Sequence, residues 1–104
     1  MENKSKAETF IGFAIRARKH KIGLNAVATL KRANLIIVCH TASENTLNDA
    51  MKLKNKFHCK MLITTEKTLG ELTHRENAKV MAVADYALAK AIIDNSENDF
   101  IARD

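Results

Sequence analysis

Hydrophobic residues recur along the chain at two spacings, which predict helices that alternate with strands. Ala7, Ile11 and Ala14 fall at i, i+4 and i+7, the apolar face of a helix over roughly residues 6–17. Residues 35–39, by contrast, form a continuous apolar run, which is typical of a strand buried on both faces. The chain therefore mixes helical periodicity with short, uninterrupted apolar segments.

The same two patterns continue to the end of the chain. Strands that alternate with helices indicate an α/β fold, arranged as a three-layer α/β/α sandwich. We expect residues 1–95 to form one domain, and residues 96–104 a polar, acidic tail that frays. After the first helix, the predicted elements are a short helix over 24–32, a strand over 35–39, a helix from Ser43 to about Phe57, a strand over 61–63, a short helix capped by Thr65, a strand over 80–84 and a final helix capped by Asp85.

The start of the first helix carries a second local signal. Ser5 and Glu8 have the spacing of a capping box, in which the hydroxyl accepts from the N3 amide and the carboxylate reaches back to the N-cap amide. We therefore expect the helix to begin just after Ser5.

Charge is distributed unevenly. The 104 residues carry a formal net charge of +5, of which residues 1–40 contribute +6 (eight Lys/Arg against Glu2 and Glu8). A positive field confined to one part of a small fold attracts polyanions such as nucleic acid. A solvated basic face that only aids solubility remains the alternative.

Composition excludes several classes of protein. The chain is 46% apolar, enough for one modest core but not for a core and a separate catalytic lobe. Its N-terminal residues contain no apolar signal segment, and its apolar runs are too short to span a bilayer. The two cysteines form no Cys-x-x-Cys motif, which fits reduced thiols and a cytoplasmic location.

No catalytic or metal-binding pattern emerges. Cys39-His40 and His58-Cys59 are adjacent pairs whose spacing matches no zinc motif. The sequence lacks a Gly-x-Ser-x-Gly elbow and a Walker-type glycine pattern. We therefore expect a protein that is not an enzyme and that uses neither a metal nor a cofactor.

Gly23-Leu24-Asn25 is the most informative local feature. A glycine at the mouth of a helix lets the backbone approach a ligand, and Asn25 offers both an acceptor and a donor there. Such a side chain can read the edge of a base while Lys21 holds phosphate. The alternative is a turn glycine followed by an ordinary helix cap.

Two further polar loops follow buried segments. One contains Ser43, and the other, over residues 74–77, contains Arg75 and Asn77. Each lies at a helix–strand junction, where backbone amides are free for anions. Simple helix capping and an ordinary solvated connection are the alternatives.

In this order, the three loops resemble those of the kink-turn-binding ribosomal proteins, the group of archaeal L-seven-Ae and eukaryotic L-thirty-e. Short bacterial YlxQ-type members are the most similar branch. The resemblance covers roughly residues 8–95. The stretches that carry it are residues 11–19, 42–46, 68–70 and 79–85.

The resemblance implies a mixed central sheet and binding to RNA that bends sharply at sheared G·A pairs. In that family a Gly-x-Asn-Glu element begins the second helix and contacts the sheared guanines. Here Gly23 and Asn25 carry over, whereas Ala26 stands in place of the Glu and Thr29 in place of a frequent Lys. These departures weigh against strict kink-turn specificity more than against general affinity for structured RNA.

We therefore expect a monomeric, ribosomal or ribosome-associated RNA-binding protein without a membrane partner. The alternative is a non-catalytic protein-interaction module on the same fold that has lost kink-turn recognition. The residues that we expect to contact RNA are Arg18, Lys19, Lys21, Gly23, Leu24, Asn25, Lys31, Ser43, Arg75 and Asn77.

Overall fold

Five helices and five strands alternate along the described part of the chain. The structure is a computed structural model that describes residues 5–96 and 100–103. The elements are α1 (Lys6–Arg16), β1 (His20–Ile22), α2 (Leu24–Ala28), β2 (Leu35–Val38), α3 (Glu44–Phe57), β3 (Lys60–Thr64), α4 (Leu69–Thr73), β4 (Val80–Val83), α5 (Tyr86–Asp94) and β5 (Phe100–Arg103).

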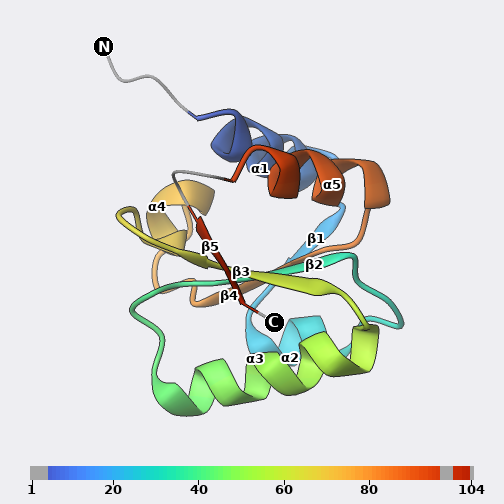
Figure 1. Cartoon of the computed structure of the whole chain (residues 1–104), viewed down its shortest axis with the longest axis vertical. Coiled ribbons are helices and arrows are strands. Elements are labelled where there is room, and N and C mark those ends of the chain that lie inside the picture. The colour runs from blue at the N-terminus through green and yellow to red at the C-terminus, as the bar shows by residue number, and fades with distance from the viewer. Residues whose placement is uncertain (1–4, 97–99, 104) are drawn as a thin grey trace.

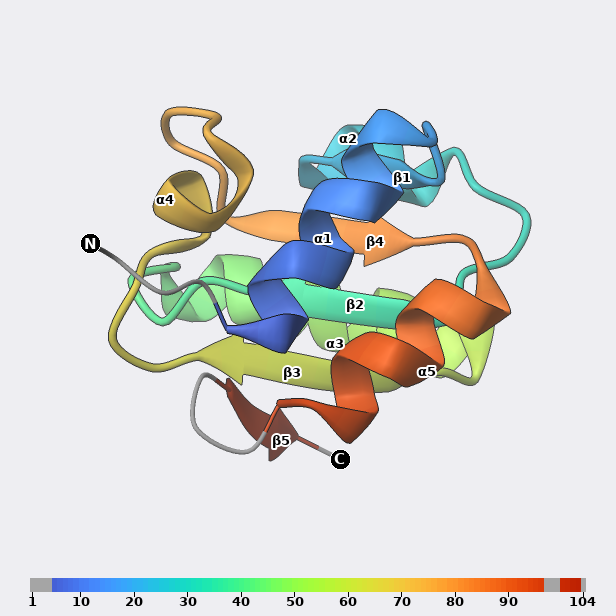
Figure 2. The same ribbon diagram turned by 90° about the horizontal axis from the view of Figure 1, so that it is seen from above.

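The strands form one mixed sheet in the order β1-β4-β2-β3-β5. β2 and β3 are parallel, whereas the β1–β4, β2–β4 and β3–β5 pairs are antiparallel. Helices α1, α4 and α5 cover one face of the sheet, and α2 and α3 cover the other (Figures 1 and 2). The expected three-layer α/β/α sandwich with a mixed central sheet is confirmed.

β2 contributes side chains to both hydrophobic cores, as its continuous apolar run predicts. Successive strand side chains point to opposite faces, so Leu35 and Ile37 join the core beneath α1 and α5, while Ile36 and Val38 join the core above α2 and α3. All four are at most 1% exposed. Full burial of such a side chain contributes about 1.5–3 kcal/mol, so this strand anchors both layers.

Only half of the expected capping box is present at α1. The Ser5 hydroxyl accepts from the Glu8 amide at 3.1 Å. The Glu8 carboxylate instead accepts from Lys67 Nζ at 2.9 Å, across a sequence separation of 59 residues. The carboxylate is nearly buried, so a charged partner outside the helix stabilises it there.

Two elements differ from the sequence prediction in their boundaries. α2 ends at Ala28 instead of Arg32, and the Thr29 hydroxyl donates to the Ala26 carbonyl at 2.6 Å. α4 is capped by Thr68 and not by Thr65. Thr68 and Glu71 form a complete capping box there, which is the reason the helix begins at residue 69.

Two strands were not predicted, because neither carries an apolar run of its own. β1 lies between the first helix and Gly23, where no strand was predicted, and it pairs with the otherwise open edge of β4. β5 lies within the expected tail, where it pairs with β3 and buries Phe100. Residues 97–99 and 104 of that tail lie outside the described residues.

Candidate nucleic-acid interface

Three polar loops meet at one end of the sheet, where β2 and β3 finish and β4 begins. We call this the loop end and define it by residues 23–25, 41–43 and 75–79. The Gly23 amide donates to the Val80 carbonyl at 2.8 Å, and the Cys39 amide donates to the Lys79 carbonyl at 2.8 Å. These two bonds hold the starts of α2 and of the β2–α3 loop against two consecutive residues, Lys79 and Val80, at the start of β4.

Gly23 adopts a conformation that suits glycine alone among the common residues. Its φ of 97° and ψ of 143° turn the chain from β1 into α2. Asn25 follows in the first turn of α2, with its side chain exposed to solvent and without a hydrogen bond to another described residue. Leu24 instead packs against the core above α2 and α3, so it anchors the helix.

Ser43 and Thr41 shape the second loop. The Ser43 hydroxyl accepts from the Thr46 amide at 3.1 Å and donates to the Thr46 hydroxyl at 3.0 Å. Ser43 is therefore the N-cap of α3, as the sequence predicted. The Thr41 hydroxyl accepts from Lys79 Nζ at 2.7 Å, which joins this loop to the start of β4.

The third loop connects α4 to β4 through two turns. The Arg75 amide donates to the Gly70 carbonyl at 3.2 Å, and the Ala78 amide donates to the Arg75 carbonyl at 3.3 Å. Asn77 has a φ of 63°, which asparagine tolerates better than most residues. Arg75 and Asn77 are both exposed.

The structure therefore separates the ten predicted contact residues into two groups. Gly23, Leu24, Asn25, Ser43, Arg75 and Asn77 belong to the loop end, and Lys21 lies on the neighbouring edge strand β1.

Arg18, Lys19 and Lys31 lie at the opposite end of the sheet. The Ala84 amide, just beyond β4, donates to the Lys19 carbonyl at 2.8 Å. Since a strand rises about 3.3 Å per residue, β1 carries Lys19 roughly 13 Å from Gly23. These cations therefore do not lie beside Gly23, because residues 20–22 extend as a strand.

Charge at the loop end is nearly balanced. Among the described residues, the cations there are Arg75 and Lys79, and the adjoining segments carry Lys67 and the exposed acids Glu44, Glu66, Glu71 and Glu76. Electrostatic attraction of phosphate at this end must therefore come from individual contacts, because no broad positive field is present.

His20, the first residue of β1, has an unusual environment for a titratable group. Its Nδ1 atom is buried and has no hydrogen-bond partner in the described structure. Burial lowers the pKa of His20, and the positive charge of Arg75 adds to the effect. Both effects favour the neutral imidazole.

The two thiols differ in their environments. Burial raises the pKa of the Cys59 thiol. Burial acts in the same direction on Cys39, but hydrogen bonds with the Thr41 hydroxyl at 3.0 Å and from the Leu69 amide at 3.4 Å outweigh it and lower its pKa. Within residues 5–96 and 100–103, no group of three or more His, Cys, Asp or Glu side chains could hold a metal ion.

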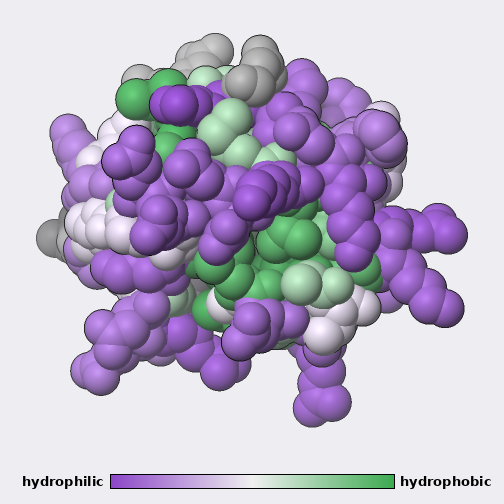
Figure 3. Space-filling view, turned by 90° about the horizontal axis from the view of Figure 1, so that it is seen from below, coloured by the Kyte–Doolittle hydropathy of each residue, from purple (hydrophilic) through white to green (hydrophobic). Residues whose placement is uncertain are grey.

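The face formed by α2 and α3 exposes hydrophobic side chains. Figure 3 shows them as a patch surrounded by hydrophilic groups. Leu30, Leu47 and Met51, together with Leu24, are only partly buried and pack against the core of this layer. No helix of the described segments combines the length and apolar character that crossing a bilayer requires.

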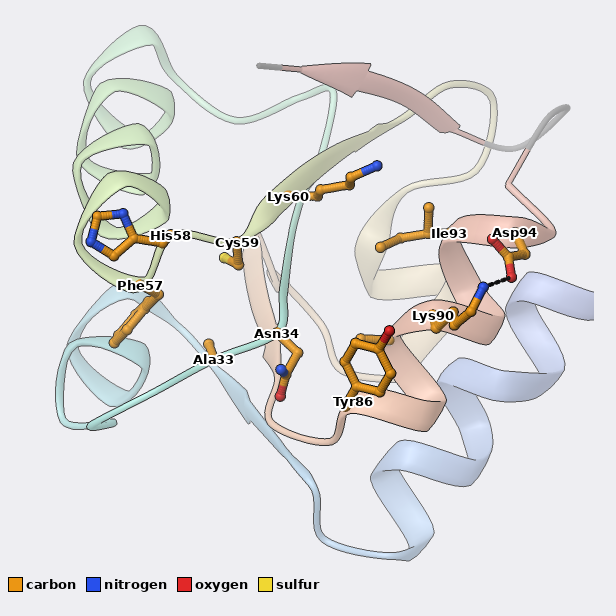
Figure 4. A pocket seen from close by; sticks show the side chains of 11 residues that line it. Ala33, Asn34, Phe57, His58, Cys59, Lys60, Tyr86, Lys90, Ile93 and Asp94 are labelled. Atoms are coloured by element: carbon orange, nitrogen blue, oxygen red, sulfur yellow. Dashed lines mark hydrogen bonds and ion pairs between the residues drawn. The ribbon is translucent and has the colours of Figure 1, made fainter.

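A cavity that the sequence did not reveal opens at the end of the sheet opposite the loop end. It has a volume of about 490 Å³ and lies between the end of α3 and α5, which lines it along its whole length. Figure 4 shows Phe57 and His58 on one side and Tyr86 and Lys90 on the other. Its walls come from segments far apart in sequence, so no local motif marks it.

Comparisons with known proteins bear only on the fold. No protein-family model matches the chain, and a search of curated protein sequences found no match. A solved structure described as a protein with unknown function from Bacillus halodurans is similar, with a TM-score of 0.76 and 18% identity. The match covers 91% of this chain and 100% of that one. At this identity, the likeness shows that the two chains share a fold.

Proposed function

We propose that this protein binds structured RNA through its loop end, as a ribosomal or ribosome-associated component of the cytoplasm. The observation that carries the proposal is the convergence of three polar loops on residues 79 and 80. The Gly23–Val80 and Cys39–Lys79 backbone bonds hold these loops together. Because the bonds fix backbone positions, the side chains above them form one surface.

The groups on this surface suit RNA. Asn25 presents a donor and an acceptor that no described residue occupies, which is what reading an unpaired or sheared base edge requires. Lys21 and Arg75 are exposed, and neither forms an ion pair with a carboxylate in residues 5–96 or 100–103. They are the phosphate contacts that we propose for this end.

Recognition of a kink-turn is the finer part of the proposal. Of the Gly-x-Asn-Glu element that the resemblance to the kink-turn-binding ribosomal proteins implies, Gly23 and Asn25 are present. Ala26 supplies no side-chain acceptor, and the Thr29 hydroxyl is already used by the Ala26 carbonyl. A missing base contact costs roughly 1–3 kcal/mol of discrimination, by analogy with readout of DNA bases. We therefore propose a preference for bent RNA that is weaker than a complete Gly-x-Asn-Glu element would give.

The apolar patch on α2 and α3 favours a second candidate function. A non-catalytic protein-interaction module would use such a surface. The same departures, Ala26 and Thr29, fit a chain that no longer recognises kink-turns.

Fluorescence anisotropy of two labelled RNAs separates the candidates. One RNA carries a bulge and tandem sheared G·A pairs, and the other is a continuous duplex of the same length. The proposal predicts binding to both at low salt, with a preference for the bent RNA that persists as salt is raised. Absence of binding to either RNA at low salt would leave only the protein-interaction candidate.

A further inference from the structure

Among the described residues, most of the cations that form no ion pair lie at the end of the molecule opposite the loops. This basic end, where β2 and β3 begin and β4 finishes, surrounds the 490 Å³ cavity. The acids near it in the described residues are Asp85, which caps α5, and Asp94. Besides Arg18, Lys19 and Lys31, the cations here are Arg32, Lys54, Lys56, Lys60, Lys90 and Arg103.

The cavity holds an aromatic ring that is positioned for stacking. Tyr86 is the first residue of α5 and is 70% exposed, although an aromatic side chain of its size is usually buried. Its helix is held by the Asp85 side chain, which accepts from the Leu88 amide at 2.9 Å. The ring is therefore presented to solvent from a fixed backbone.

Polar groups without partners lie beside the ring. The Asn34 side chain faces the cavity next to Tyr86, and Lys60 extends from β3 toward α5 (Figure 4). Neither side chain hydrogen-bonds to another described residue. The backbone of Asn34 is fixed, because its amide donates to the Val83 carbonyl at 2.9 Å.

We propose that the basic end binds an unpaired stretch of RNA, with one nucleotide seated in this cavity. The base stacks on Tyr86 and is read by the Asn34 amide, while Lys60 and the surrounding cations bind its phosphates. The volume suits a nucleotide, since small-molecule sites commonly span about 300–1,000 Å³. This proposal rests on the proposed function in one respect, that the protein binds RNA. It does not require that the loop end be a binding site.

Lys90 is the one cavity cation that already has a partner. Its Nζ lies 2.9 Å from Asp94 Oδ2, and both side chains are more than half exposed. An exposed pair of this kind is weak and screened by salt, so a phosphate can replace the carboxylate. Lys60 forms no ion pair within the part of the chain that the structure describes, which makes it the better residue for a test.

Tyr86 provides its own reporter. The chain contains a single tyrosine and no tryptophan, so its intrinsic fluorescence reports this cavity alone. We would titrate the full chain with an oligouridine of about ten nucleotides, within the range bound by single-strand sites. N-acetyltyrosinamide corrects for absorption by the RNA. The expected result is saturable quenching that weakens as salt is raised.

Variants assign the signal to the site. We expect Lys60→Ala to weaken the quenching isotherm several-fold. Lys6→Ala, at an exposed lysine in the first turn of α1, should leave it unchanged. In anisotropy with labelled oligouridine, Tyr86→Ala should lose about tenfold in affinity and Tyr86→Phe should lose little, because stacking needs the ring and not the hydroxyl.

Several outcomes would overturn the proposal. Uridine monophosphate that saturates the quenching as tightly as the oligomer would make the cavity a site for free nucleotides. If polyglutamate displaces oligouridine as well as RNA of equal charge does, the basic end is a surface that binds polyanions in general. If RNA does not quench Tyr86 but binding to bent RNA still depends on Asn25, this site is ruled out and the proposed function stands. Failure of every RNA to bind would remove both.

Discussion

Lys79 Nζ donates a 2.7 Å hydrogen bond to Thr41 Oγ1, and this contact joins the β2–α3 loop to the start of β4. The two residues are 38 positions apart in sequence. The Cys39 amide donates to the carbonyl of the same lysine. Lys79 thus holds the neighbouring loop through its backbone and its side chain.

We expect Lys79→Ala and Thr41→Val both to weaken binding to bent RNA. Thr41→Val removes the acceptor but leaves every charge in place, so a matching loss would show that the contact positions the loop. Stability should change by less than about 1 kcal/mol in each case, since the bond is exposed. Anisotropy and urea denaturation measure the two effects. If Thr41→Val binds like the wild type while Lys79→Ala does not, Lys79 acts only through its charge.

Asn25→Ala should weaken binding to bent RNA more than binding to a plain duplex. The side chain is proposed to read a base edge, and loss of such a contact costs roughly 1–3 kcal/mol. Lys21→Ala should weaken both RNAs alike and lower the salt slope by about one unit, because it contacts phosphate alone. Parallel salt titrations on the two RNAs provide the measurement. Equal losses on both RNAs for Asn25→Ala would argue against base reading.

Substitution of alanine for two glycines should shift stability in opposite directions. Gly23 has a φ of 97°, where an L side chain is strained, so Gly23→Ala should destabilise by about 1–2 kcal/mol. Gly12 lies inside α1, and a Cβ there meets nothing within 4 Å. Gly12→Ala should therefore stabilise by about 0.5–1 kcal/mol, through helix propensity. Urea midpoints test both variants, and stabilisation by Gly23→Ala would contradict the observed turn.

Stability should fall as pH drops below about 6.5, and His20 should account for part of the loss. Burial and Arg75 lower its pKa, so the folded chain holds this proton more weakly than the unfolded chain does. Folding is then penalised as the pH falls from the unfolded value towards the folded one. His20→Gln removes the titration.

The stability of the wild type relative to His20→Gln should therefore decrease between pH 7.5 and pH 5, as measured by urea denaturation. Arg75→Gln should flatten this dependence, because it removes one of the charges that depress the pKa. A wild type and a His20→Gln variant that lose stability in parallel would show that His20 does not contribute.

The last strand offers a test of an element that the sequence did not reveal. Phe100 is 5% exposed and packs in the core beneath α1 and α5, whereas Ile101 is 61% exposed. Phe100→Ala should cost several kcal/mol, up to the roughly 3–5 kcal/mol found for buried aromatic residues. Ile101→Ala should stay within about 0.5 kcal/mol. Equal, small effects would mean that β5 contributes little to stability.

Local chemistry was sufficient to predict the main elements. The apolar run of β2, the helical spacing of Ala7, Ile11 and Ala14, and the caps at Ser43 and Asp85 all depend on neighbours in sequence, and the structure confirms them. The alternation of these elements was likewise enough for the layered architecture, since each apolar face must be buried against another.

Tertiary structure decided where the charges lie and which edges of the sheet are paired. β1 and β5 form because β4 and β3 present backbone groups that need hydrogen-bond partners. The sequences of β1 and β5 do not reveal that these edges are available for pairing. The same pairing carries Lys19 away from Gly23 and places Tyr86 beside Asn34. Contacts between residues distant in sequence depend on the register of the whole sheet, so the basic end and its cavity become visible only once the chain is folded.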